Sequence, residues 1–157
     1  MKKLSHLDEE GRASMVDVGA KESTRREAIA HARVRMSPET LRLVEQVALP
    51  KGDALATARV AGILAAKKAS SLIPLTHPLP LTFVDVAFEL DREKGAIEVL
   101  ATVRCEGRTG VEIEAMTACA VAALTLYDMC KSAEKGIVIE QIALLRKSGG
   151  KGGTWER

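Results

Sequence analysis

Charged side chains stand at both ends of an otherwise apolar segment between residues 111 and 133. The sequence VEIEAMTACAVAALTLYDMCK begins with Glu112 and Glu114 and ends with Asp128 and Lys131. Asp128 and Lys131 are three residues apart, so a helix places both on one face. In a dry, apolar setting such a pair can have shifted pKa values and transfer protons, whereas on a surface it is an ordinary salt bridge. The residues alone leave both interpretations open.

The two glutamates follow a glycine-containing turn, EGRTG, at the expected start of the helix. Carboxylates in the first turn are favoured by the helix dipole and need no further role. Glu112 and Glu114 could also accept hydrogen bonds from a polar ligand, such as the amino and ring N–H groups of a purine.

Two other stretches have the composition of anion sites. KGD puts Lys51 and a glycine before a helix amino terminus that Asp53 caps, where free backbone N–H groups favour phosphate. RKSGGKGG interleaves Arg146, Lys147 and Lys151 with glycines, so its backbone could wrap an anion. The alternatives are a surface lysine beside an ordinary cap and a flexible tail.

One histidine lies in the apolar stretch LIPLTHPLPL, residues 72–81. His77 is either a structural residue or a ligand contact, and no second histidine or cysteine follows at metal spacing, which disfavours zinc. The three prolines of this stretch exclude a helix and impose an extended path.

The elements that must position these residues follow from hydrophobic periodicity. AIAHARVRM alternates apolar and charged residues, which predicts a strand over 28–36. The remaining pattern predicts a helix from Pro38, capped by Ser37, to about Leu49, and a second helix over 54–72. It also predicts strands over 84–90 and 96–105, a helix over 111–133 and a strand over 136–145. This order predicts an α+β ferredoxin-like βαββαβ sandwich with an antiparallel sheet and an extra helix in the first crossover.

Composition narrows the class of protein. The 157 residues suit one domain, and we expect a flexible amino terminus over 1–14, a single domain over 15–147 and a glycine-rich tail over 148–157. Basic and acidic residues are intermixed at a net charge of +2, which excludes a broad nucleic-acid footprint. The start has no apolar signal core, and the longest apolar stretch is shorter than a membrane span, so we expect a cytoplasmic protein without a membrane partner.

The spacing of the two charged groups carries a geometric constraint. Glu114 and Asp128 are fourteen residues apart, which is roughly 21 Å along a straight helix. A nucleoside base with its first phosphate does not comfortably span this distance. If both ends serve one site, a second subunit must supply one of them.

Four long motifs follow one another between Met15 and Gly153: MVDVG, KGDALATARVAGILAAKKASSLIPLTHPLPL, TGVEIEAMTACAVAALTLYDMCK and LLRKSGGKGG. Together they resemble the cyclic pyranopterin monophosphate synthase family of molybdenum cofactor biosynthesis. The resemblance implies a lyase that converts (8S)-3',8-cyclo-7,8-dihydroguanosine 5'-triphosphate, made by a radical SAM GTP cyclase, to cyclic pyranopterin monophosphate with release of diphosphate. It implies a homohexamer, a trimer of dimers with active sites at subunit interfaces. It implies no cofactor of the protein's own, and leaves open a Mg²⁺ ion that accompanies the triphosphate.

The resemblance also assigns residues. Asp128 and Lys131 match the family's catalytic pair. The positions that match substrate-contacting and other active-site residues are Leu75, Thr76, His77, Ile113, Glu114, Lys51 and Glu112. Basic residues around the phosphates match Lys21, Arg26, Lys147 and Lys151. The family usually has cysteine where this chain has Thr76, so the segment's role here rests on backbone groups and a hydroxyl.

These positions suggest a mechanism. We expect Asp128 and nearby cations to tune Lys131 to a lowered pKa, so that it transfers protons near neutral pH. Lys51, His77 and the basic tail would bind the triphosphate and stabilise charge at the phosphorus. The alternatives are a nucleotide-binding ferredoxin-like sensor without turnover and an inert oligomeric scaffold.

Overall fold

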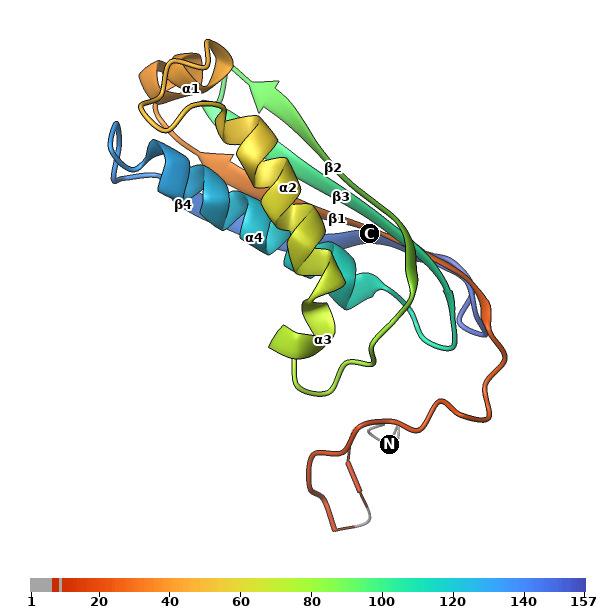
Figure 1. Cartoon of the computed structure of the whole chain (residues 1–157). Coiled ribbons are helices and arrows are strands. Elements are labelled where there is room, and N and C mark those ends of the chain that lie inside the picture. Colours follow the sequence, from red (N-terminus) through yellow and green to blue (C-terminus); the bar gives the residue numbers. More distant parts are fainter. Residues whose placement is uncertain (1–6, 9) are drawn as a thin grey trace.

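Five strands form one antiparallel sheet in the order β2-β3-β1-β4-β5 (Figure 1). The computed structural model describes residues 7, 8 and 10–157. Its strands are β1 Thr24–Arg35, β2 Leu81–Asp91, β3 Ala96–Gly107, β4 Val138–Ser148 and β5 Trp155–Glu156, and its helices are α1 Pro38–Glu45, α2 Ala54–Lys67, α3 Ala69–Leu72 and α4 Glu112–Cys130. The order of the four long strands is that of a ferredoxin-like sheet, so the predicted fold class is confirmed.

The predicted alternation of the first strand determines which side of the sheet is buried. On one side of β1 lie Ala28, Ala30, Ala32 and Val34, all fully buried. The helices α2 and α4 lie on this side and pack against each other (Figure 1). Small side chains on the sheet let the helix backbone of α4 come close.

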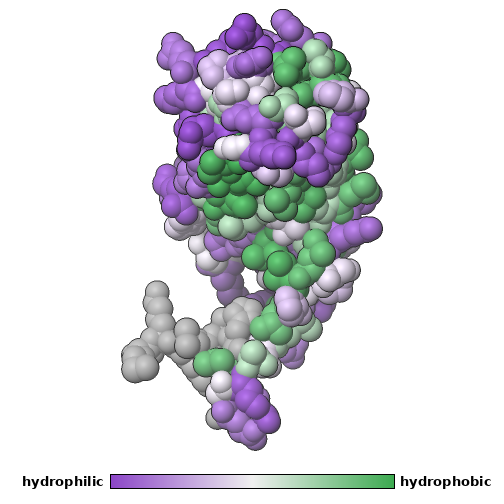
Figure 2. Space-filling view, turned by 90° about the vertical axis from the view of Figure 1, so that its left-hand side faces the viewer, coloured by the Kyte–Doolittle hydropathy of each residue, from purple (hydrophilic) through white to green (hydrophobic). Residues whose placement is uncertain are grey.

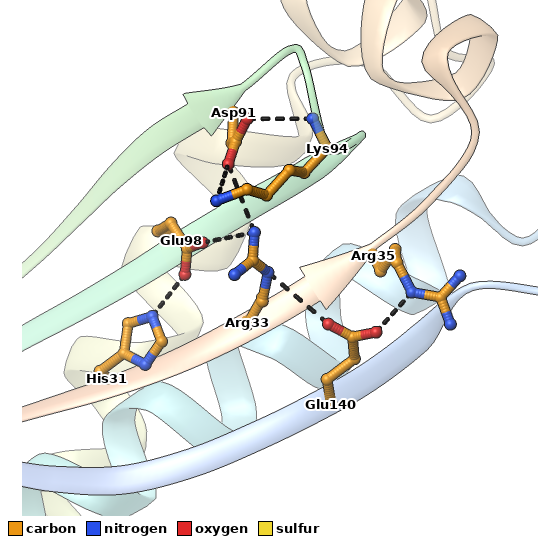
Figure 3. Close-up of polar contacts among 7 residues, drawn as sticks. All are labelled: His31, Arg33, Arg35, Asp91, Lys94, Glu98 and Glu140. Atoms are coloured by element: carbon orange, nitrogen blue, oxygen red, sulfur yellow. Dashed lines mark hydrogen bonds and ion pairs between the residues drawn. The ribbon is translucent and has the colours of Figure 1, made fainter.

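The opposite side of the sheet carries charged cross-strand contacts (Figure 3). Arg33 of β1 reaches Glu98 of β3 at 3.2 Å and Asp91 of β2 at 3.3 Å. Arg33 and Arg35 also contact a carboxylate of β4, Glu140. Opposite charges across neighbouring strands stabilise a sheet modestly and fix its register.

Both predicted helix caps are present. The side chain of Ser37 accepts from the N–H of Thr40 at 3.2 Å, and that of Asp53 accepts from the N–H of Ala56 at 2.9 Å. These contacts satisfy backbone donors that have no partner within the helix.

Several element bounds differ from the prediction. The first helix ends at Glu45 instead of near Leu49, because Val47 has a φ of 53° and leaves the helical path. The predicted helix over 54–72 is divided at Lys68 into α2 and α3. The last strand runs to Ser148, and after the glycine turn β5 pairs with it through Trp155 and Lys147.

By length and composition α4 could cross a membrane, and within the described residues it alone meets that test. The helix is longer than the apolar stretch of the prediction because it also includes Glu112, Glu114 and Asp128. Half of the stretch is buried against the sheet and the other helices, and a core helix passes the same test.

A close helix crossing is built on Gly62 of α2. A Cβ atom there would lie 2.9 Å from the carbonyl oxygen of Ala118 and 3.3 Å from the Cβ of Ala122, both on α4. Contacts of this kind with backbone cannot be relieved by rotating a side chain. The two helices therefore approach as closely as they do only because residue 62 has no side chain.

We expect Gly62→Ala to lower the free energy of unfolding by about 1–2 kcal/mol, because overpacking outweighs the gain in helix propensity. Urea unfolding followed by circular dichroism measures this. The matched control is Ala61→Gly, which reports helix propensity one residue away. A Gly62→Ala chain more stable than the unchanged protein would contradict the crossing described here.

Candidate active site

Two adjoining cavities lie at the amino-terminal end of α4. The first has a volume of about 270 Å³ and the second about 770 Å³. Lys21, Thr109 and Gly110 line both, so the two cavities lie side by side and share these residues.

The first cavity brings together residues that are far apart in the sequence. Leu75, Thr76 and His77 come from the segment between α3 and β2, and Ile113 and Glu114 come from the first turn of α4. The predicted substrate-contacting segments thus line a single apolar cavity. Its remaining lining residues include two from the amino-terminal arm, Val16 and Val18.

Glu114 is the buried charged group of this cavity. Only 4% of the residue is exposed. Burial raises the pKa of its carboxyl group, the neighbouring charge of Glu112 raises it further, and its own backbone N–H lowers it. A carboxyl group with a raised pKa in an apolar cavity can accept a hydrogen bond when ionised, or donate one when protonated.

The orientation of His77 is fixed by the amino-terminal arm. Its Nε2 lies 2.8 Å from the carbonyl oxygen of Val16. A carbonyl oxygen only accepts, so Nε2 carries the hydrogen in this contact. Beside it, the hydroxyl of Thr76 donates to the carbonyl of Ile73 at 2.7 Å. The hydroxyl oxygen of Thr76 therefore keeps only its accepting capacity for a ligand.

The second cavity is strongly cationic. Among its lining residues are five basic side chains, those of Lys21, Arg26, Arg108, Lys147 and Lys151, against two carboxylates, those of Glu22 and Glu112. All four basic residues that the sequence suggested around the phosphates are present. Arg108 was missed, although the turn EGRTG that holds it precedes the helix and is itself a signal of an anion site.

Specific contacts hold these cations in place. Lys147 lies 3.2 Å from a carboxylate oxygen of Glu112, and the Nε of Arg26 donates to the carbonyl of Gly107 at 3.2 Å. Gly150 has a φ of 71°, and a Cβ there would lie 1.8 Å from a guanidinium nitrogen of Arg26. The glycine-rich turn after β4 thus lets backbone and guanidinium come together.

The third predicted group lies at the other end of α4. The carboxylate of Asp128 contacts the ammonium groups of Lys51 at 2.6 Å and Lys131 at 2.7 Å. Hydrogen bonds from Lys131 and then Lys51 lower the pKa of Asp128 to about 2. The hydrogen bond between Lys131 and Asp128 has the opposite effect on the lysine and raises the pKa of Lys131.

Of the two interpretations that the sequence leaves open for this pair, the single chain has the exposed salt bridge, and the expected lowered pKa of Lys131 is wrong. The side chains of Asp128 and Lys131 are each 51% exposed, and the pKa of Lys131 is raised instead of lowered. An apolar helix sequence does not say which side of its last turn is covered, and here that side faces solvent. Neither cavity is lined by Lys51, Asp128 or Lys131.

An apolar cavity with a buried carboxyl group, beside a cationic cavity in a ferredoxin-like domain, suits an α+β protein that binds a phosphorylated ring compound. The sequence profile of the MoaC family matches residues 15–150, and the chain belongs to this family.

Curated relatives agree with that profile. An enzyme of Bordetella avium named cyclic pyranopterin monophosphate synthase is 59% identical over 97% of this chain and 94% of its own length. Enzymes of the same name from Chloroflexus aurantiacus and a Roseiflexus strain are 56% and 58% identical over 98% and 99% of this chain. The resemblance stated from the motifs is therefore confirmed.

We expect Glu114→Gln to change the pH dependence of stability. Burial raises the pKa of Glu114 above its ordinary value of 4.5, so the carboxyl contributes most below that pH and its contribution is lost as pH rises through the folded pKa. An amide does not ionise. The free energy of unfolding of Glu114→Gln, relative to the unchanged protein, should therefore rise with pH above 4.5.

Urea unfolding across this pH range measures the difference. The matched control is Glu106→Gln, at an exposed position of β3. A difference between Glu114→Gln and the unchanged protein that stays constant with pH would show that Glu114 ionises as freely when folded as when unfolded.

Proposed function

We propose that this protein is a phosphorus–oxygen lyase, a cyclic pyranopterin monophosphate synthase. It would convert (8S)-3',8-cyclo-7,8-dihydroguanosine 5'-triphosphate to cyclic pyranopterin monophosphate and release diphosphate, in molybdenum cofactor biosynthesis. The observation that carries the proposal is that a cationic cavity adjoins an apolar cavity lined by Glu114, with Lys21, Thr109 and Gly110 common to both. The names of the relatives support the same reaction.

The two cavities divide the substrate between them. The triphosphate would lie among Lys21, Arg26, Arg108, Lys147 and Lys151, where charge-assisted hydrogen bonds are strong. The purine-derived ring would enter the first cavity, with its polar edge toward the carboxyl group of Glu114. Cations placed in advance around the phosphates also stabilise charge that develops as diphosphate leaves.

Lys131 and Asp128 are the proposed catalytic pair. Asp128 raises the pKa of Lys131, so the lysine of the isolated chain holds its proton more tightly than a free lysine does. This differs from the expected lowered pKa, so proton transfer by Lys131 near neutral pH would need the desolvation that a second copy and the substrate bring. Lys51 shares the same carboxylate and would add positive charge beside a phosphate.

A second copy of the chain would bring this pair to the cavities. Val121 lies midway between Glu114 and Asp128 on α4. An antiparallel pairing of two α4 helices about a twofold axis near Val121 would therefore place the Asp128 of one copy beside the Glu114 of the other. Within one chain Glu114 and Asp128 lie at opposite ends of α4. This pairing would bring Glu114 of one copy close to Asp128 of the other.

The exposed side of the helices supports such a pairing. Hydrophobic surface gathers across the middle of this side of the molecule (Figure 2). Leu124 of α4, at 58% exposure, and the exposed Val60 and Leu64 of the adjoining α2 are apolar. Apolar patches of this kind mark association surfaces. We propose a homohexamer, a trimer of dimers, with this surface within the dimer.

The remaining proposals concern the cellular setting. We place the enzyme in the cytoplasm, after a radical SAM GTP cyclase that supplies its substrate. We propose that it needs no cofactor of its own, with Mg²⁺ entering, if it takes part, on the triphosphate. Nucleic acid and membrane are not proposed as partners.

Incubation with the cyclised substrate tests the function. We expect release of pyrophosphate and appearance of the fluorescent oxidised pterin, and we expect Lys131→Ala to lower turnover by roughly 10²–10⁴-fold. The comparison variant is Lys135→Ala, an exposed lysine just beyond α4. Substrate binding without pyrophosphate release by the unchanged protein would favour the sensor alternative, and full turnover by Lys131→Ala would remove that lysine from the mechanism.

Subunit complementation tests the composite site. Lys131→Ala and Glu114→Gln should each be inactive, but dimers that contain one copy of each variant have one site with both residues intact. After unfolding, mixing and refolding together, we expect turnover to recover to about a quarter of that of the unchanged protein, by random pairing about a twofold axis.

The control mixes Lys131→Ala with Lys51→Ala, which alter the same end of α4 and so leave no intact site in a mixed dimer. Recovery in this control, or none in the first mixture, would contradict a site shared between two copies.

A further inference from the structure

The amino-terminal arm touches the first cavity through a short segment. Val16, Val18 and Lys21 line this cavity, and Lys21 also lines the second. Figure 1 shows the arm leaving β1, passing near the segment between α3 and β2, and then running away from the body. We call residues 16–21 the strap.

The strap makes few contacts with the rest of the domain apart from those at the two cavities. Within the residues that the structure describes, the strap has one hydrogen bond to the rest of the domain, between the Val16 carbonyl and His77. Farther out, Asp8 accepts hydrogen bonds from Arg12 and Glu10, so the contacts there are local to the arm. The strap contributes no residue to the fully buried core.

Yet the strap has a defined shape. The carboxylate of Asp17 accepts from the N–H of Gly19 at 2.8 Å, and the N–H of Lys21 donates to the carbonyl of Val18 at 3.0 Å. These two contacts close consecutive turns: in the first, the Asp17 carboxylate replaces a backbone acceptor, and in the second, the acceptor is the backbone carbonyl of Val18. The turns place Val16 and Val18 at the first cavity and turn Lys21 toward both cavities.

The chemistry of the cavity gives the strap a role. Its apolar lining comes from Leu75, Leu79 and Ile113 on the domain and from Val16 and Val18 on the strap. A planar ring with its polar edge at Glu114 needs apolar surface against its faces. A segment held by one hydrogen bond can move away from the cavity to admit the ring. It can then return to cover the ring with a small loss of conformational entropy.

We propose that the strap is a specificity element of the active site, which covers the ring of the substrate with Val16 and Val18 and positions His77 through the Val16 carbonyl. This inference rests on the proposed function, because it takes the ligand to be a ring joined to phosphates. Asp17 is a positioning residue that acts through the turn. The strap contributes to recognition of the ring, and the cationic cavity recognises the phosphates.

Binding of two probes separates these contributions. GTP carries both a ring and a triphosphate, whereas pyrophosphate carries phosphates alone. We expect Val18→Ala to weaken GTP binding roughly tenfold, the usual effect of removing methyl groups from an apolar contact, and to leave pyrophosphate binding unchanged. Met15→Ala, at an exposed arm residue outside the cavities, is the matched control and should change neither. Isothermal titration calorimetry measures the affinity of the unchanged protein and of both variants for each probe.

The turn is tested by two variants of Asp17. Asp17→Asn keeps a side-chain oxygen that can accept from Gly19, whereas Asp17→Ala does not. With the cyclised substrate, we expect Asp17→Ala to raise KM several-fold with a smaller effect on kcat, and Asp17→Asn to restore most of the difference. An equal rise in KM in both variants would show that the charge of Asp17 is needed. It would contradict a role of Asp17 through the turn.

The outcomes distinguish this inference from the proposed function. If the unchanged protein binds both probes and Val18→Ala leaves GTP affinity unaltered, the strap does not recognise the ring, and the proposed function stands. If the unchanged protein binds neither probe and releases no pyrophosphate from the cyclised substrate, the proposed function itself fails. Unchanged melting temperatures in all variants are expected, because the strap lies outside the core.

Discussion

The close packing of α4 on the sheet is the constraint on which the rest of the structure depends. Ala28, Ala30 and Ala32 of β1 and Ala115, Ala118 and Ala122 of α4 are all fully buried. Each alanine in this layer buries less apolar surface than a leucine would. The small side chains nevertheless bring the backbones close, and the tight packing leaves the helix little room to shift. The helix is therefore a rigid spacer with Glu114 at one end and the Asp128–Lys131 pair at the other.

The two ends differ because burial differs along one helix. At the amino-terminal end Glu114 is enclosed, and burial raises its pKa. At the carboxyl-terminal end Asp128 is exposed and hydrogen bonded to two ammonium groups, which lower its pKa to about 2. Two carboxylates of similar intrinsic acidity thus acquire opposite tendencies, and such divergence is typical of groups with different chemical roles.

Much of the fold could be predicted because it follows from local patterns. Alternation in AIAHARVRM predicted β1, and the cap residues Ser37 and Asp53 predicted where α1 and α2 begin. The end of α1 could not be predicted, because nothing in the type of Val47, a β-branched residue, suggests a positive φ.

The site was predicted unevenly for a physical reason. Motif resemblance supplied Leu75, Thr76, His77 and Glu114, and the structure places all four at one cavity. The exposure of Lys131 and the position of the strap depend on which surfaces lie beside one another in space. A single sequence states neither, since an apolar helix can be covered on any of its sides.

The cationic cavity also has to be stable before a ligand arrives. Basic side chains close together repel one another, and this repulsion would tend to open the empty cavity. Glu112 partly neutralises the charge by pairing with Lys147, and the carbonyl of Gly107 holds Arg26. A triphosphate bound in this cavity would compete with Glu112 for Lys147. A ligand with several negative charges can offset the loss of this pair, whereas a singly charged anion gains less, so the internal carboxylate biases the cavity toward polyphosphates.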